Sequence, residues 1–253
     1  MFPLERQNKI IDLLKSNNVL KITELTEALN ISTDTLRRDL NLLEKQGKIE
    51  KIYGGAKIAE SKFFESSMEE RMVSHLEEKE KIAKKCAEHI EDGDCIYLDS
   101  GSTTLQIAKF IRDKKNLTVV TNSIPIINEL INSSIELIII GGKIRRNEQS
   151  VVTYDYLFNF NELNILKTFI CASGITIEKG ISDYNLEEAI TRKKIIELSN
   201  INYVAADSTK FGKNVTVHIA PLEKIDYIIT DSQINKSFIS KFSKTDTHLV
   251  ISE

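Results

Sequence analysis

The sequence predicts an α/β protein with two domains: a small helical N-terminal domain that ends in a β-hairpin, and a larger domain built on an open parallel sheet. Apolar residues at helical spacing fill the first fifty positions and lead to a Gly-Gly pair. From Glu77 onward, short runs rich in Ile and Val alternate with helical stretches, which is the order of an open α/β domain. The 253 residues, 41% of them apolar and 28% charged, suffice for two soluble domains.

Composition excludes several classes of protein. Apolar runs stay well below the ~18–20 residues of a membrane span, and the charged start of the chain has no signal-peptide pattern. The three cysteines, Cys86, Cys95 and Cys171, lack CxxC spacing and indicate reduced thiols in the cytoplasm. The four scattered histidines show no metal-site spacing, so we expect no metal.

Three helices are predicted in the N-terminal domain. The first covers residues 4–16, and the second covers 24–29 after Thr23. Asn30 suits a tight turn because it tolerates left-handed backbone. The third helix is capped by Ser32 and runs to about residue 46, where a glycine follows.

Two short helices joined by a tight turn are typical of a helix-turn-helix, whose second helix enters the major groove of DNA with its N-terminus first. Small hydroxyl residues can approach base edges there, and an arginine can bind guanine or hold a phosphate. The candidate DNA contacts of this helix are Ser32, Thr33, Thr35, Arg37 and Arg38. The alternative is a helical interaction module whose arginine pair is only solvated.

Residues 48–58 alternate around Gly54-Gly55 and carry three lysines, which predicts a hairpin that lies along DNA as the wing of a winged helix. Lys51 and Tyr53 are the candidate contacts on this wing. We therefore expect a winged helix-turn-helix domain at 1–58, a linker at 59–76 in which Phe63-Phe64 pack between domains, and an α/β domain at 77–253.

Near-continuous apolar runs predict seven buried strands in the α/β domain, at 95–98, 117–120, 137–140, 168–172, 203–206, 227–230 and 247–251. Helices are predicted near residues 77–91, 103–113, 124–132, 186–199 and 234–242.

Polar turns follow several of these strands, at the sheet edge where open α/β domains bind ligands. The turn after the first strand opens a helix, whose free N–H groups suit an anion, and Gly101 lets the backbone approach it closely. The candidate residues in these turns are Asp99, Gly101, Ser102, Thr103, Thr104, Thr121, Asn122, Ser123, Gly141, Gly142, Lys143, Ser173, Gly174, Asn185 and Lys210. This chemistry suits a small phosphorylated polyol, with its phosphate at residues 101–104 and its hydroxyls at Asp99, Asn122 or Asn185.

Cofactor chemistry is not expected. The first strand is not followed by GxGxxG, which argues against a nicotinamide cofactor, and the glycine turn lacks the lysine of a nucleotide-hydrolysing loop. Asp183, Glu187 and Glu188 fit a general base for sugar isomerisation, or else the ordinary acidic start of a solvated helix.

Residues 6–58 resemble the N-terminal domain of the DeoR family of bacterial transcriptional regulators. The resemblance rests on the run 35–44, on Gly47 and on the Gly54-Gly55 wing, with Tyr53 where the family usually has His. It extends over 77–253 through the turn 99–104, the motifs at 121–123, 141–143, 173–175 and 185–189, and the run 206–212.

The resemblance implies that the C-terminal domain is similar in fold to pentose-phosphate isomerases but acts as a sensor of phosphorylated sugars. It implies that the turn at 100–104 is the phosphate cradle, with Lys210 as a charge partner and Lys79 near the pocket. The run Val151-Val152-Thr153-Tyr154 departs from the family's usual Val-Gly-Pro, so we expect Tyr154 and Tyr156 to change the pocket's shape.

Together these patterns predict a regulator, a repressor of sugar metabolism genes, that binds operator DNA as a homodimer or homotetramer under control of a phosphorylated sugar. No membrane partner is expected. Two alternatives stay open: a sugar-phosphate isomerase-like enzyme with a DNA-binding appendage, and a constitutive DNA-binding protein whose α/β domain serves only oligomerisation.

Overall fold

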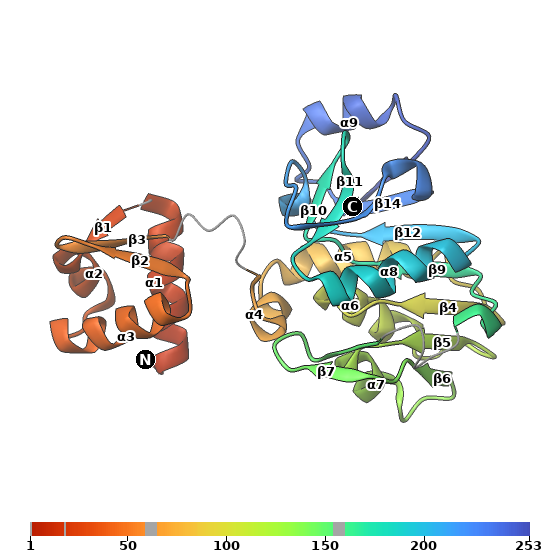
Figure 1. Ribbon diagram of the computed structural model, residues 1–253, viewed down its shortest axis with the longest axis horizontal. Helices are drawn as coiled ribbons and strands as arrows, with labels where there is room; N and C mark the ends of the chain where they lie inside the picture. The colour runs from red at the N-terminus through yellow and green to blue at the C-terminus, as the bar shows by residue number, and fades with distance from the viewer. Residues whose placement is uncertain (1, 18, 59–64, 154–159) are drawn as a thin grey trace. The chain divides into compact units, whose positions relative to one another are not determined.

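The computed structural model describes residues 2–17, 19–58, 65–153 and 160–253 (Figure 1). The chain divides into two compact units, Met1–Phe64 and Glu65–Glu253, called here the N-terminal and C-terminal units. Phe63-Phe64, Tyr154 and Tyr156 lie outside the described residues. Within the described ranges, no helix is both long and apolar enough to cross a membrane.

The N-terminal unit combines three helices with a small antiparallel sheet, as the sequence predicts, and adds one short strand. The sheet has the order β1-β3-β2, and the pair β2–β3 is the predicted hairpin. The elements are α1 (Pro3–Asn17), β1 (Val19–Lys21), α2 (Ile22–Leu29), α3 (Thr33–Lys45), β2 (Ile49–Ile52) and β3 (Gly55–Ile58).

Local signals set the ends of these helices. Asn30 takes the left-handed conformation (φ 51°) directly after α2, and the Ser32 side chain accepts the N–H of Thr35 at 3.2 Å at the start of α3. The apolar faces then meet in one core, whose fully buried members include Ile10, Leu25 and Leu36. Because α3 turns its buried stripe inward, its polar stripe stays exposed.

The C-terminal unit is built on a seven-stranded sheet in which every neighbouring pair is parallel, in the order β15-β14-β12-β9-β4-β5-β6. The strands are β4 (Cys95–Leu98), β5 (Thr118–Thr121), β6 (Glu136–Ile139), β9 (Lys167–Ile170), β12 (Ile201–Ala205), β14 (Tyr227–Asp231) and β15 (His248–Ser252). The strand order reverses between β4 and β9. In open α/β sheets such a reversal leaves a crevice beyond the carboxyl ends of the strands.

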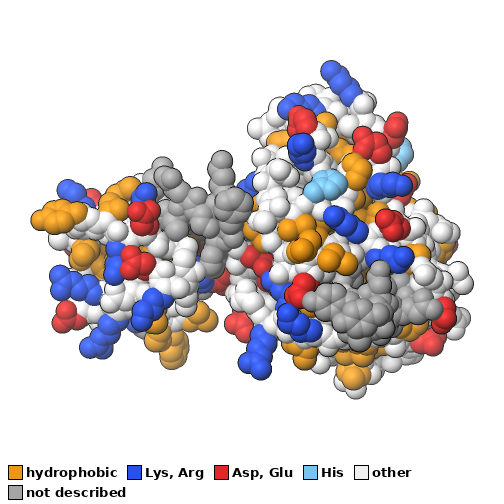
Figure 2. Space-filling model, in the orientation of Figure 1, with side chains coloured by type: hydrophobic (Ala, Val, Ile, Leu, Met, Phe, Trp, Pro, Cys, Tyr) orange, Lys and Arg blue, Asp and Glu red, His pale blue; other side chains and the backbone are white. Residues whose placement is uncertain are grey.

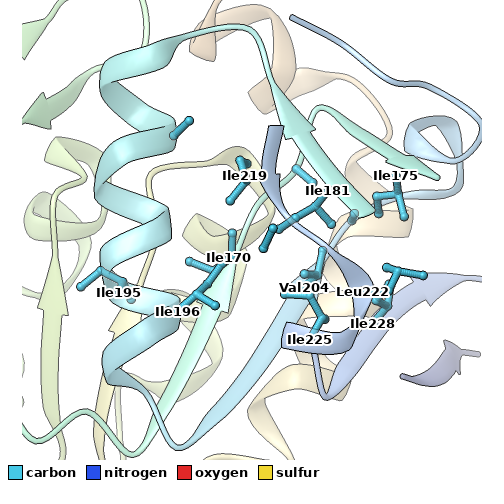
Figure 3. Close-up of a cluster of buried hydrophobic side chains, with 14 of the residues drawn as sticks. Ile170, Ile175, Ile181, Ile195, Ile196, Val204, Ile219, Leu222, Ile225 and Ile228 are labelled. Atoms are coloured by element: carbon cyan, nitrogen blue, oxygen red, sulfur yellow. The ribbon is translucent and has the colours of Figure 1, made fainter. Parts of the chain in front are cut away.

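Helices cover both faces of this sheet (Figure 1). The helices are α4 (Met68–Val73), α5 (Leu76–Ala87), α6 (Ser102–Ile111), α7 (Ile124–Leu130), α8 (Leu186–Leu198) and α9 (Lys236–Phe242), with 3₁₀ turns at Phe160–Glu162, Ser208–Lys210 and Leu222–Lys224. Successive strand residues alternate between two cores: Phe169 packs with α5, α6 and α7, whereas Ile170 packs with α8 (Figure 3). Both faces are therefore apolar, which explains the uninterrupted Ile and Val runs.

Two small antiparallel sheets stand beside the main one. They are β7 (Lys143–Arg145) with β8 (Ser150–Val152), and β10 (Gly174–Thr176) with β11 (Gly180–Asp183) and β13 (Val217–Ala220). Residues 65–76, the last two thirds of the predicted linker segment, belong to the C-terminal unit and include α4 and the first residue of α5. Met68 is fully buried in the core beneath α5 and α6, so this helix packs as part of the sheet domain.

Candidate functional site

A pocket opens in the C-terminal unit where the strand order reverses. Its lining comes from residues that directly follow β4, β9 and β12, from α4, α5 and α8, and from the loop between β7 and β8. The lining residues are Glu65, Arg71, Lys79, Ser100, Gly101, Ser102, Thr103, Glu148, Cys171, Ala172, Ser173, Asp183, Arg192, Ala205, Ala206, Asp207 and Lys210. Six predicted site residues lie among them: Lys79, Gly101, Ser102, Thr103, Ser173 and Lys210.

The start of α6 forms one wall of the pocket. Its N-cap is Gly101, which supplies no capping side chain, and no described residue accepts the N–H groups of Ser102, Thr103 and Thr104. The buried Ser100 hydroxyl also lacks a partner among the described residues. Helix N-termini with free N–H groups attract anions, so this wall suits a phosphate or carboxylate.

Gly101 is required here for space. Its φ of −171° is ordinary extended backbone, but a Cβ at this position would lie 2.2 Å from the Sγ of Cys171. The missing side chain lets the turn after β4 sit directly against the turn after β9.

Asp99 and Thr104 lie beneath the predicted phosphate cradle at residues 100–104. Both side chains are fully buried and form hydrogen bonds to backbone groups around the pocket. The Asp99 carboxylate accepts the N–H of Cys171 at 2.9 Å and the Nε–H of Arg192 at 2.6 Å. The Thr104 hydroxyl donates to the carbonyl oxygen of Asp99 at 2.6 Å. They shape the pocket without lining it.

Thr121, Asn122 and Ser123 also serve the framework. The Thr121 hydroxyl donates to the Leu98 carbonyl at 2.7 Å, and Ser123 caps α7. Asn122 donates to the carbonyl oxygen of Val151 at 3.0 Å, so it ties β5 to β8.

The remaining predicted residues lie away from the pocket lining. Gly142 packs against the Val152 carbonyl, and Lys143 is exposed and pairs with Glu187 at 3.2 Å. Three further residues from the prediction are Gly141, which has open space around it, Gly174, which packs on the Lys213 backbone, and Asn185, which caps α8.

Arg192 is the centre of a buried charge cluster that the sequence did not single out. Its guanidinium donates to Asp99 and to Asp183, and its Nη2 lies 3.8 Å from the Oε2 of Glu188. Burial raises the pKa of Asp99 to about 6, although the guanidinium opposes the shift. On a helix that continues with Lys193 and Lys194, Arg192 resembles a solvated residue, and only the packing of α8 on the sheet reveals its role.

Arg71 and Lys79 bring two more cations to the pocket wall. Arg71 donates N–H groups of Nη1 and Nη2 to the two carboxylate oxygens of Glu148. Burial is the main reason that the pKa of Lys79 falls to about 8. Arg71 stands in the segment that the sequence suggested as linker, and no local pattern marked it.

Lys210 faces Asp207 at the third polar turn. Burial alone would raise the pKa of Asp207, but Lys210 and a hydrogen bond from Thr209 lower it below its usual value. The pocket thus offers cations near the α6 N-terminus and carboxylates on the facing walls. An anion with attached hydroxyl groups matches both.

The three carboxylates considered as a general base are engaged in other ways. Asp183 pairs with Arg192 and accepts the N–H of Tyr184, and Glu188 accepts from Arg145 and from the Ser150 hydroxyl. Glu187 pairs with a lysine on the surface. None of the three is held in the pocket as an unpaired base.

The predicted DNA contacts lie on the polar stripe of α3 and on the hairpin. Ser32, Thr33, Arg37 and Arg38 are exposed, and Thr35 is half-buried. Lysine and arginine side chains are spread over the visible face of this unit (Figure 2). The geometry of α3 matches a recognition helix, since its inner stripe is core and its outer stripe is polar.

The two predicted wing contacts differ in their surroundings. Tyr53 stands fully exposed at the turn between β2 and β3. Lys51 instead bonds Asn41 at 2.7 Å and Glu44 at 2.8 Å, so it fastens the hairpin to α3.

Comparison with known families covers both units. The DeoR-like helix-turn-helix domain matches residues 6–62, and the DeoR C terminal sensor domain matches residues 74–232. The chain belongs to the DeoR family. The resemblance drawn from the sequence is thereby confirmed over nearly the whole length.

Curated relatives in the DeoR family align with this chain over most of their length and are named as transcriptional regulators or repressors. The HTH-type transcriptional regulator GolR of Listeria innocua is 35% identical and covers 100% of both chains. The HTH-type transcriptional regulator IolR of Bacillus subtilis is 35% identical over 93% of this chain and 94% of its own. The glycerol-3-phosphate regulon repressor of Escherichia coli is 31% identical over 90% of each. This DeoR-family chain is likewise a DNA-binding transcriptional regulator and not an enzyme.

Among solved structures, ribose 5-phosphate isomerase A from Methanocaldococcus jannaschii matches 55% of this chain and 56% of its own, at 18% identity and a TM-score of 0.42.

Proposed function

We propose that this regulator represses genes of sugar metabolism and releases its operator when a phosphorylated sugar binds the C-terminal unit. One observation carries the proposal: the uncapped N-terminus of α6 lines a pocket that also holds Lys79 and Lys210. A phosphate group fits this combination of free N–H groups and cations.

The hydroxyl groups of the sugar would meet the acidic walls. Glu148, Asp183 and Asp207 line the pocket and are hydrogen-bond acceptors when ionised. The relatives support a sugar-related effector, since one is named a glycerol-3-phosphate regulon repressor. We therefore propose a small polyol or sugar monophosphate as the effector class.

The N-terminal unit binds the operator in this proposal, with Ser32, Thr33, Thr35, Arg37 and Arg38 on the recognition helix and Tyr53 on the wing. Lys51 acts there mainly by holding the hairpin. A single recognition helix reads few base pairs, so we propose that the protein binds as a homodimer or homotetramer. Analytical ultracentrifugation of the full chain, with and without operator, distinguishes these assemblies from a monomer.

Binding of the protein to the DNA upstream of its own gene tests the proposal, at one fixed salt concentration. Salt is fixed because each phosphate contact on DNA steepens the salt dependence by about 0.9 in log–log slope. We expect tight binding that one phosphorylated sugar releases and its unphosphorylated form does not. Tight binding that is indifferent to every sugar phosphate tested would contradict the effector half and leave the DNA half intact.

A further inference from the structure

Arg71 and Lys79 each join the pocket to helix α4. Arg71 belongs to α4, and its Nη1 donates to Oε1 of Glu148 at 3.1 Å while Nη2 donates to Oε2. Lys79, on α5, donates its Nζ protons to the carbonyl oxygens of Arg71 and Ser74, both at 2.5 Å. Both cations therefore face the pocket and also hold the helix in place.

Apolar packing and a capping box also anchor α4. The helix has six residues, too few to be stable alone, so its position depends on its contacts. Met68 supplies the apolar anchor, and its N–H donates to the Asn147 carbonyl at 3.0 Å. At the other end Val73 is largely exposed. Met72 also packs, partly buried, against this core, so the C-terminal half of α4 is held by that side chain together with the polar contacts of Arg71 and Lys79.

A phosphate in the pocket competes for the same protons. A guanidinium pairs with phosphate in the same two-point manner as with carboxylate, and the phosphate carries more negative charge. The hydrogen bonds of the Lys79 ammonium to described residues go to two neutral carbonyl groups, and an anion beside it offers a stronger acceptor. An anion in the cradle therefore competes for Arg71 and Lys79 with the contacts that these two side chains make at α4.

We infer that the effector's anionic group draws Arg71 away from Glu148 and Lys79 away from the α4 carbonyls, and so releases the C-terminal half of α4. The inference rests on the proposed function of the pocket. Residues 59–64 link α4 to the N-terminal unit through the chain, and α4 is the first helix after them. α4 is then the element through which occupancy of the pocket acts on operator binding.

Hydrogen exchange of the full-length protein tests this release, with inorganic phosphate and a sugar monophosphate as separate probes. We expect the amides of residues 70–75 to exchange at least about fivefold faster when the probe is bound, within the usual range of allosteric coupling. The amides at the start of α6 should exchange more slowly in the same sample, because the probe covers them.

Glu148→Gln is the decisive variant, since it keeps the shape and removes the charge that holds Arg71. It should bind inorganic phosphate more tightly than the wild type, show fast exchange at residues 70–75 without any probe, and bind the operator more weakly without any probe. Asp94→Asn is the matched control. It breaks a buried ion pair of 2.8 Å with Lys167, away from the pocket, and should leave all three readouts unchanged.

If Glu148→Gln does not fold, Arg71→Lys replaces it, because lysine keeps the charge but loses the two-point pairing. We again expect fast exchange at residues 70–75 and weaker operator binding, both without a probe. Wild-type exchange and wild-type operator affinity in this variant would overturn the inference.

The outcomes separate the two proposals. If the probe binds and releases the operator while residues 70–75 exchange as before, the inference about α4 is overturned and the proposed function stands. If Glu148→Gln behaves like Asp94→Asn, the coupling through Arg71 is likewise overturned. If neither probe binds and the wider panel of sugar phosphates also fails to release the operator, the proposed function fails, and the inference that rests on it fails too.

Discussion

Arg192 donates its Nε–H to the Oδ2 of Asp99 across 2.6 Å, and both side chains are almost wholly buried. The same guanidinium donates to Asp183 and lies near Glu188. One Arg192 cation thus serves three carboxylates, of which Glu188 also pairs with Arg145 at 3.1 Å.

Replacement of Arg192 by Met should destabilise the C-terminal unit by about 3–5 kcal/mol, because it takes the paired cation away from the buried carboxylates of Asp99 and Asp183. Asp99→Asn should have a smaller effect, about 1–2 kcal/mol, since Arg192 keeps its other partners. Urea unfolding of the two variants measures the difference. Equal losses would show that the cluster does not depend on the arginine in this way.

Thr103→Glu should abolish the effector response and leave operator binding intact. It places a carboxylate at the α6 N-terminus, where it occupies the free N–H groups and repels an anionic ligand. Titration with the sugar phosphate that releases the wild type checks this. Lys109→Glu makes the matched control, because it adds negative charge to an exposed position at the far end of the same helix. A normal response in Thr103→Glu would place the anion elsewhere.

The low pKa of Lys79 predicts a pH dependence. The folded protein loses this proton near pH 8 and the unfolded chain near 10.5, so between these values the unfolded state binds more protons and the contribution of Lys79 to stability rises with pH. A bound anion favours the charged form, so ligand affinity should fall as the pH rises through about 8. Calorimetry with a phosphate ester from about pH 7 to about pH 9.5 avoids titration of the phosphate itself, whose second pKa is about 6.

Lys79→Arg provides the control for this experiment, since arginine stays protonated throughout. Its affinity profile should be flat across the same range. A decline equal to that of the wild type would mean that another group titrates.

Gly101→Ala should destabilise the C-terminal unit by about 1–3 kcal/mol, because the new methyl group meets the Sγ of Cys171. Combining it with Cys171→Ala removes the sulfur and should cost less than the sum of the two single changes, by about 1 kcal/mol or more. Thermal or urea unfolding of the four proteins closes this double-mutant cycle. If the two losses in the free energy of unfolding simply add, the new methyl group does not clash with the Sγ of Cys171.

Arg37→Ala and Arg38→Ala should each weaken operator binding by about 1–3 kcal/mol, roughly 5- to 150-fold, without unfolding the N-terminal unit. Both side chains are exposed on α3, so the fold does not need them. Lys45→Ala, an exposed change at the C-terminal end of the same helix, is the control. Wild-type operator affinity in both arginine variants would refute the recognition-helix assignment.

The sequence was a good guide to the regular elements. All seven strands of the parallel sheet were predicted, because a strand that is apolar on both faces gives an unbroken signal. The strands of the two smaller sheets have only three or four residues each and escaped prediction. The helix α4 was also missed, since one buried residue, Met68, in a six-residue helix gives no periodicity.

The pocket was only partly predictable. The glycine and hydroxyl residues after β4 predict the turn that lines the pocket. Lys79 was assigned to the pocket only through the family resemblance. Arg71, Glu148 and Arg192 come from a short helix, a loop and a helix interior, and they meet only because the sheet brings distant segments together. Side chains recruited by topology leave no local pattern in a single sequence.

Asp39, within the arginine-rich run of α3, faces inward and is held by Arg6 at 2.5 Å and Gln7 at 3.1 Å from the first helix. Its neighbours Arg37 and Arg38 point to solvent. Neighbouring positions on α3 thus have different roles: Asp39 contacts the first helix, and the two arginines form part of the exposed face. Substitutions at the two outward positions therefore alter the exposed face of α3 and leave the contacts between Asp39 and α1 in place.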